Sequence, residues 1–137
     1  MSVHTTTHIN FRGQAREALE FYHAALGGSI ALITYGQMGA TDAADEIVWG
    51  QVATDSGFRV MAYDVPAALP FSRGDDPFFV SIRGTSADEI AAVWAALVEG
   101  STVKVPLAPS DWAPLYGMLT DPFGITWVLD VEVAYAG

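Results

Sequence analysis

Large apolar residues recur at every second position near the end of the chain, which predicts a strand with two different faces. In residues 119–131, an Asp-Pro pair and Gly124 mark a turn before this strand. The strand itself has two sets of side chains, namely Ile125, Trp127 and Leu129 on one parity and Thr126, Val128 and Asp130 on the other. Because neighbouring side chains of a strand point to opposite faces of the sheet, we expect the first set to pack and the second to face elsewhere.

Two stretches with helical periodicity, residues 15–28 and 87–100, align with each other without a gap and both end at glycine. Ser86 followed by Glu89 has the spacing of a capping box at the start of the second helix. The expected buried stripes are Ala15, Ala18, Leu19, Tyr22 and Leu26 in the first helix and Ile90, Val93, Trp94 and Leu97 in the second. Each helix therefore has one face to bury.

The segments around these helices repeat in the same order. "HINFRG" (8–13) precedes the first helix and "FVSIRG" (79–84) precedes the second. After the helices, residues 49–64 and 116–130 share an aromatic-glycine pair, a Thr-Asp turn, a later glycine and a closing aspartate. The repeat predicts an order of strand, helix and three strands, twice over.

The expected organisation is one α+β domain, residues 1–137, made of tandem βαβββ modules at about 5–66 and 76–134. Residues 35–46 form the longest loop within a module, and residues 64–76 link the two modules.

The chain resembles the vicinal oxygen chelate superfamily of glyoxalase, bleomycin-resistance and extradiol dioxygenase proteins, and within it the PhnB-like branch. The resemblance rests on "NFRGQAREALEFYHAALGG" (10–28) and "VPLAPSDWAPLYGMLTDPFGITWVLDV" (105–131). It implies that the sheets of the two βαβββ modules curl around a cleft, and that the protein is a homodimer. Some members of the branch are called 3-demethylubiquinone-9 3-methyltransferase, but this sequence has no glycine-rich first turn of a doubly wound sheet to support methyl transfer.

Alternation assigns the faces of the strands, because the helices need apolar partners. The residues expected beneath the helices are Ile9, Phe11, Phe58, Val60, Val80, Ile82, Ile125, Trp127 and Leu129. The opposite parity, expected to face the cleft, is His8, Asn10, Arg59, Met61, Tyr63, Phe79, Ser81, Thr126, Val128 and Asp130.

In metal-dependent members of the superfamily, four strands each supply one ligand, typically histidine or glutamate. Carried onto this sequence through the repeat, these positions are His8, Met61, Phe79 and Val128. Imidazole and carboxylate suit a divalent Lewis-acid metal, whereas three of these four side chains offer neither. The branch often has a histidine on its third strand, where this chain has Trp49. We therefore expect no metal site and no cofactor.

The charge of the chain narrows the class of partner. Six Lys and Arg against sixteen Asp and Glu give a formal net charge of −10, which disfavours nucleic acid and anionic membranes and favours a cationic ligand. The chain has no cysteine, and its first residues lack the pattern of a secretion signal. Together these features favour a cytoplasmic protein.

Aromatic and soft side chains gather at the positions expected to face the cleft, and the proline-interrupted segment 109–117 is typical of a loop above it. The candidate ligand-binding residues are His8, Asn10, Trp49, Met61, Tyr63, Phe79, Trp112, Tyr116 and Val128. They favour binding of a small flat or cationic organic ligand. A metal-dependent or metal-independent lyase, isomerase or dioxygenase is the alternative, and no catalytic residues can be assigned from the sequence.

Overall fold

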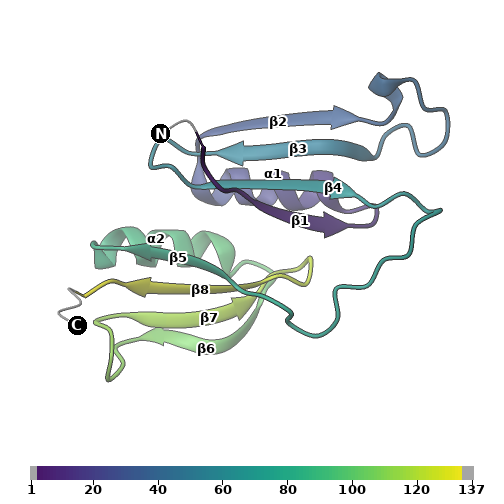
Figure 1. Ribbon diagram of the computed structural model, residues 1–137. Helices are drawn as coiled ribbons and strands as arrows, with labels where there is room; N and C mark the ends of the chain where they lie inside the picture. Colours follow the sequence, from purple (N-terminus) through teal and green to yellow (C-terminus); the bar gives the residue numbers. More distant parts are fainter. Residues whose placement is uncertain (1–2, 134–137) are drawn as a thin grey trace. The chain divides into compact units, whose positions relative to one another are not determined.

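The computed structural model describes residues 3–133 and has the predicted order of strand, helix and three strands, twice over (Figure 1). The chain divides between Arg73 and Gly74 into two compact parts, called unit 1 and unit 2 below. The elements of unit 1 are β1 (Thr7–Phe11), α1 (Ala15–Leu26), β2 (Ser29–Thr34), the short 3-10 helix η1 (Gly36–Met38), β3 (Ile47–Ala53) and β4 (Arg59–Asp64). The elements of unit 2 are β5 (Val80–Gly84), α2 (Ala87–Leu97), β6 (Thr102–Ala108), β7 (Tyr116–Thr120) and β8 (Thr126–Val131).

Each unit has one mixed four-stranded sheet with a helix on one face (Figure 1). The strand orders are β1-β4-β3-β2 and β5-β8-β7-β6, and in both sheets the first pair is parallel and the others are antiparallel. The α+β class and the two βαβββ modules are thus confirmed, although position 134, the expected end of the second module, lies outside the described residues. Neither helix within residues 3–133 is long and apolar enough to cross a bilayer.

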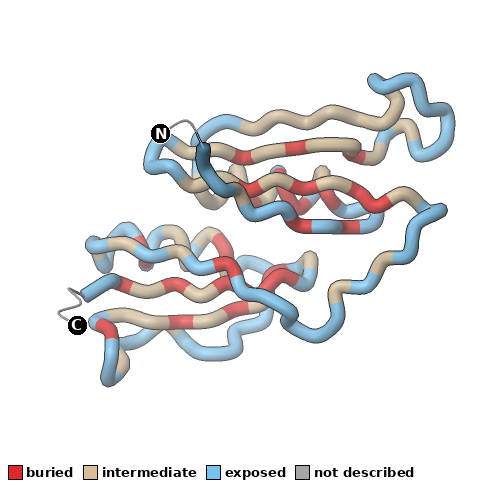
Figure 2. The backbone as a smooth tube through the Cα atoms, viewed as in Figure 1, coloured by how far each residue is buried: buried red, intermediate tan, exposed pale blue. Residues whose placement is uncertain are grey.

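The predicted core faces are confirmed in both units at all but two positions. Buried positions alternate with less buried ones along β4 and, from Trp127 onward, along β8 (Figure 2). The fully buried strand residues include Ile9, Phe11 and Val60 in unit 1 and Trp127 and Leu129 in unit 2. Two residues depart from the expectation. Phe58 precedes β4 and is half-buried, and Ile82 of β5 is also half-buried.

The aromatic-glycine repeat has a packing reason. A Cβ atom at Gly50 of β3 would lie 2.4 Å from Leu19 Cδ1 of α1, and one at Gly117 of β7 would lie 2.9 Å from Trp94 Cζ3 of α2. Each glycine therefore lets a helix side chain lie directly on the sheet.

The two helices begin and end differently. Ser86 Oγ accepts a hydrogen bond from the Glu89 amide of α2 (3.3 Å), which confirms half of the predicted capping box. In the described part of the chain, the side chain of Gln14, the residue before α1, makes no capping hydrogen bond. Asp64 Oδ1 instead accepts a hydrogen bond from the Ala15 amide (3.0 Å). The second helix ends at Leu97 and not at Gly100, and Ser101 Oγ donates to the Leu97 carbonyl (2.6 Å), which the end of the helix leaves free.

The strand register corrects the sequence repeat at two places. Met61 and Val128 hold equivalent positions after the aromatic-glycine pairs of the two repeats. Met61 lies opposite His8, whereas Val128 lies opposite Ser81. Ser81 is therefore the structural counterpart of His8, and Phe79 lies one residue before β5. The aspartates that close the two repeats also differ. Asp64 is on the buried face of its strand, whereas Asp130 is on the opposite face of its own strand.

The first part of the predicted link between modules is fastened to unit 1. Arg12 donates to the carbonyls of Pro66 and Leu69, and Arg73 donates to the Asn10 carbonyl (2.6 Å). Both guanidinium groups lie over the Phe71 ring, at 5.5 and 5.4 Å from its centroid. Residues 65–73 thus run along the β1 side of the sheet.

Candidate ligand-binding surfaces

The candidate residues of unit 1 lie on the face of its sheet turned away from α1, which we call its outer face. His8 and Asn10 of β1 lie opposite Met61 and Tyr63 of β4, and Trp49 is on the same parity of β3 as Gln51, the partner of Met61. Parity therefore brings His8, Trp49, Met61 and Tyr63 together on three neighbouring strands.

Two contacts organise this outer face. The Trp49 indole Nε1 donates to Met61 Sδ at 3.2 Å, and the His8 and Tyr63 rings meet edge to face with centroids 5.3 Å apart. Such an arrangement offers ring edges, ring faces and a polarizable sulfur, which are contacts for a flat apolar ligand.

The candidate residues of unit 2 have a second aromatic pair. Trp112 lies in the loop before β7 and Tyr116 is the first residue of β7, and their ring centroids are 5.2 Å apart at an interplanar angle of 74°. Trp112 is 62% exposed, so its ring is not part of the core. A large exposed aromatic side chain fixed by a second ring is typical of a recognition surface.

The remaining candidates of unit 2 are more dispersed. Val128 of β8 lies between Ser81 of β5 and Met118 of β7, on the outer face. Phe79 precedes β5 and is 47% exposed. Thr126, expected on the outer face, is instead buried, because its hydroxyl donates to Asp76 Oδ1 (2.7 Å) and also bonds the Thr120 hydroxyl (2.7 Å).

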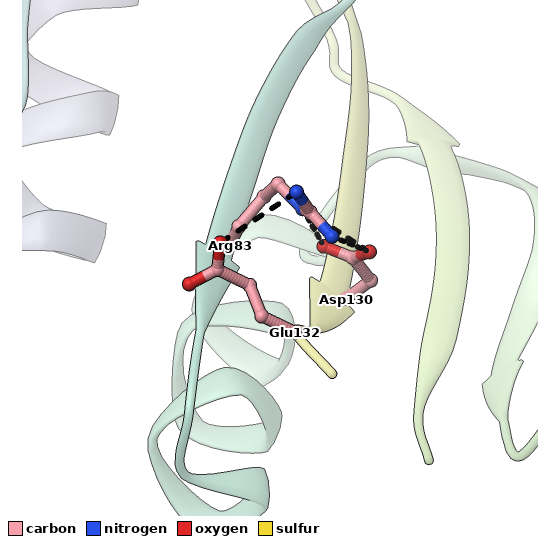
Figure 3. Close-up of polar contacts among 3 residues, drawn as sticks. All are labelled: Arg83, Asp130 and Glu132. Atoms are coloured by element: carbon pink, nitrogen blue, oxygen red, sulfur yellow. Dashed lines mark hydrogen bonds and ion pairs between the residues drawn. The ribbon is translucent and has the colours of Figure 1, made fainter. Parts of the chain in front are cut away.

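A charged cluster on β5 and β8 was not identified as a site from the sequence. Arg83 Nε lies 3.0 Å from Asp130 Oδ1, its Nη2 lies 3.3 Å from Oδ2, and its Nη1 lies 3.6 Å from Glu132 Oε1 (Figure 3). The Asp130 carboxylate raises the pKa of Arg83 further above its ordinary value. The sequence signal was available, since Arg83 and Asp130 both have the parity of the outer face.

The residues at the family's metal positions do not fit a divalent metal. Three of the four positions supply no imidazole or carboxylate: Met61, Val128, and Phe79 or its structural counterpart Ser81. His8 is the one remaining residue that could bind a metal ion. Among residues 3–133, no three His, Asp or Glu side chains lie close enough together to hold an ion. The residues at these positions therefore supply too few ligands for a divalent metal.

Two βαβββ units, each with a mixed four-stranded sheet, define the glyoxalase-like class of α+β proteins. Residues 4–129 match the Glyoxalase/Bleomycin resistance protein/Dioxygenase superfamily, and the chain belongs to it. The crystal structure of protein PA1353 from Pseudomonas aeruginosa matches with a TM-score of 0.86 and 34% identity, covering 96% of this chain and 98% of that one.

Two further relatives are more distant. A PhnB protein from Bacillus cereus, provisionally named a 3-demethylubiquinone-9 3-methyltransferase, matches with a TM-score of 0.74 and 21% identity over 95% of this chain and 100% of that one, and it shows the fold alone. Protein YjdN of Escherichia coli K12 is 23% identical over 135 residues, covering 90% of this chain and 92% of YjdN.

Proposed function

We propose that this superfamily member binds a small flat organic ligand, preferably a cationic one, and does not change it chemically. The observation that carries the proposal is the substitution of the family's metal-ligand positions by an aromatic and soft surface. Where a metal-dependent member would place its ligands, this chain has His8 against Tyr63 and Met61 against Trp49. Ring stacking and sulfur contacts bind flat molecules but supply no Lewis acid.

The residues expected from the sequence form two sets, and each set is proposed to contact ligand on its own unit: His8, Asn10, Trp49, Met61 and Tyr63 on unit 1, and Phe79, Trp112, Tyr116 and Val128 on unit 2. The exposed Trp112 ring supports the proposal most directly, because a solvated indole contributes little to folding and much to recognition. The preference for a cation is supported by the net charge of −10.

The test is calorimetric titration of the EDTA-treated protein with N-methylquinolinium, a flat organic cation. We expect saturable binding, a loss of about fivefold or more in affinity for Trp112→Ala, and weaker binding as salt rises. Met38→Ala is the matched control, since Met38 is also a large exposed apolar residue, 67% exposed, but lies in η1 of unit 1. It should leave the affinity unchanged.

Two results would contradict the proposal. An affinity that changes with neither the Trp112→Ala substitution nor the salt concentration would remove the reason for choosing this class of ligand. Turnover of a member of a small-molecule library, abolished by His8→Ala, would instead favour a metal-independent enzyme. A homodimer is a separate expectation from the family resemblance, and sedimentation at micromolar concentration that gives a monomer alone would contradict it.

A further inference from the structure

We infer that Asp130 determines the charge specificity of the Trp112–Tyr116 pair, so that this surface selects a ring compound with one positive charge. The inference rests on the proposed function and assigns the cation preference to one carboxylate of unit 2 and not to the net charge of the whole chain.

The strand register puts the carboxylate beside the rings. Asp130 of β8 lies directly opposite Tyr116 of β7, and on its other side it lies opposite Arg83 of β5. Side chains directly opposite each other on one face have Cβ atoms about 5 Å apart. Because Trp112 packs against Tyr116, a ring held by this pair lies within reach of the Asp130 carboxylate.

The surroundings of Asp130 keep a negative charge. Arg83 supplies one positive charge to two carboxylates, Asp130 and Glu132, so the cluster shown in Figure 3 carries a formal charge of −1. The Asp130 side chain is 15% exposed, and salt screens a partly buried charge less than an exposed one. Unit 2 as a whole has nine acidic and two basic residues, a balance of −7, which adds a field of the same sign.

Arg83 acts as a positioning residue for this carboxylate. Its Nε and Nη2 reach Oδ1 and Oδ2 of Asp130 in a fork, which fixes the carboxylate plane. The same guanidinium also competes with any cation that approaches Asp130. This competition predicts that removal of Arg83 strengthens cation binding, whereas loss of the fixed carboxylate plane alone would weaken it and a purely structural role would weaken the binding of every ligand.

The experiment compares N-methylquinolinium with quinoline, which is a neutral ring of nearly the same shape at pH 7.5. For Asp130→Asn we expect the affinity for the cation to fall about fivefold or more and the affinity for quinoline to change less than about twofold. Arg83→Gln should raise the cation affinity and leave quinoline unchanged. Glu99→Gln is the control, because it changes the net charge of unit 2 equally at an exposed residue after α2.

An equal loss for both ligands in Asp130→Asn, or an equal effect of Glu99→Gln on the cation, would overturn the inference while leaving the proposed function intact. If neither ligand binds the unaltered protein, the proposed function fails, and the inference fails with it.

Discussion

The two units share one topology but differ in their exposed tryptophan, their charge and the role of the aspartate that closes each repeat. In unit 1, α1 buries Ala15, Ala18, Leu19 and Tyr22, and the one buried aspartate of the unit serves the backbone. In unit 2, α2 buries Ile90 and Leu97, while Trp112 and an acid-rich cluster stay at the surface. The acidic excess follows the same division, at −3 for unit 1 and −7 for unit 2.

The two units thus keep one backbone topology while the roles of their side chains diverge. Each unit has a buried aspartate that accepts backbone amides, Asp64 in unit 1 and Asp121 in unit 2, and unit 2 adds an exposed tryptophan and an acid-rich cluster. The closing aspartates of the repeat, Asp64 and Asp130, show this most clearly, since they resemble each other in sequence and have unrelated surroundings.

Substitution of Asp64 and Asp130 should separate the two units by the largest difference in stability. Asp64 Oδ1 and Oδ2 accept from the amides of Ala15 (3.0 Å) and Ile47 (2.9 Å) in a buried site, so Asp64→Ala leaves two buried donors without a partner. We expect a loss of about 3 kcal/mol in the free energy of unfolding. Asp130→Ala removes an ion pair with the half-exposed Arg83 and should cost less than about 1 kcal/mol. Urea unfolding measures both, and equal losses would contradict the division of roles.

The shared glycines test what the units have in common. Gly50→Ala forces a methyl group against Leu19 and the Ala31 carbonyl, and Gly117→Ala forces one against Trp94 and the Leu107 backbone. Each substitution should destabilise the protein by about 1–3 kcal/mol. Gly57→Ala is the control for backbone strain, because an added Cβ at Gly57 meets no atom within 4 Å but the residue has a φ of +97°. Losses at Gly50 and Gly117 no larger than a few tenths of a kcal/mol would show that the helices do not lie this close to their sheets.

Two tryptophans of unit 2 separate packing from recognition. Trp127 is fully buried and its Nε1 donates to Asp121 Oδ2 (2.9 Å), so Trp127→Phe should cost about 1–2 kcal/mol of stability. Trp112→Phe should change stability by less than about 0.5 kcal/mol, because the indole is 62% exposed. Thermal and urea unfolding of the two variants give the comparison, and a larger loss at Trp112 would place that ring in the core.

The smallest expected effect concerns acid stability. Hydrogen bonds from Lys104 and Thr126 lower the pKa of Asp76 below its ordinary value of 3.8. A carboxyl with a lower pKa in the folded state stabilises the fold at pH above 3.8, and this contribution is lost as the pH falls through the folded-state value. Asp76→Asn should therefore flatten the decline of stability below pH 3.8, and Asp75→Asn should not. An equal decline of stability below pH 3.8 in the two variants would show that the Asp76 contacts do not persist in solution.

Much of the fold could be predicted from the sequence, because the periods of 2 and 3.6 residues and the repeat are local properties. They gave the element order and the buried parities of β1, β4 and β8 correctly. Strand register depends on contacts between distant segments, so the alignment of Phe79 with His8 missed that Ser81 occupies the paired position. The burial of Thr126 was missed for the same reason, since Asp76 lies 50 residues away in the chain.

The residue types of the candidate site could be predicted from the sequence, but the side chains that contact one another could be predicted less well. The Trp49–Met61 and Trp112–Tyr116 contacts follow from residues that the sequence had singled out. The role of Arg83 was not found, because its parity indicates the outer face but only the strand register shows that Asp130 lies beside it.

The most direct test of ligand recognition through the exposed aromatic pair is one NMR titration of the four tryptophan indole N–H resonances with N-methylquinolinium. The indole groups of Trp49, Trp94, Trp112 and Trp127 give separate reporters on both outer faces, the α2 contact and the core. We predict that the Trp112 resonance shifts saturably and that the Trp127 resonance does not move. The Trp112 resonance is identified by its absence from the spectrum of Trp112→Phe. A Trp112 resonance that stays fixed through the titration would contradict the account.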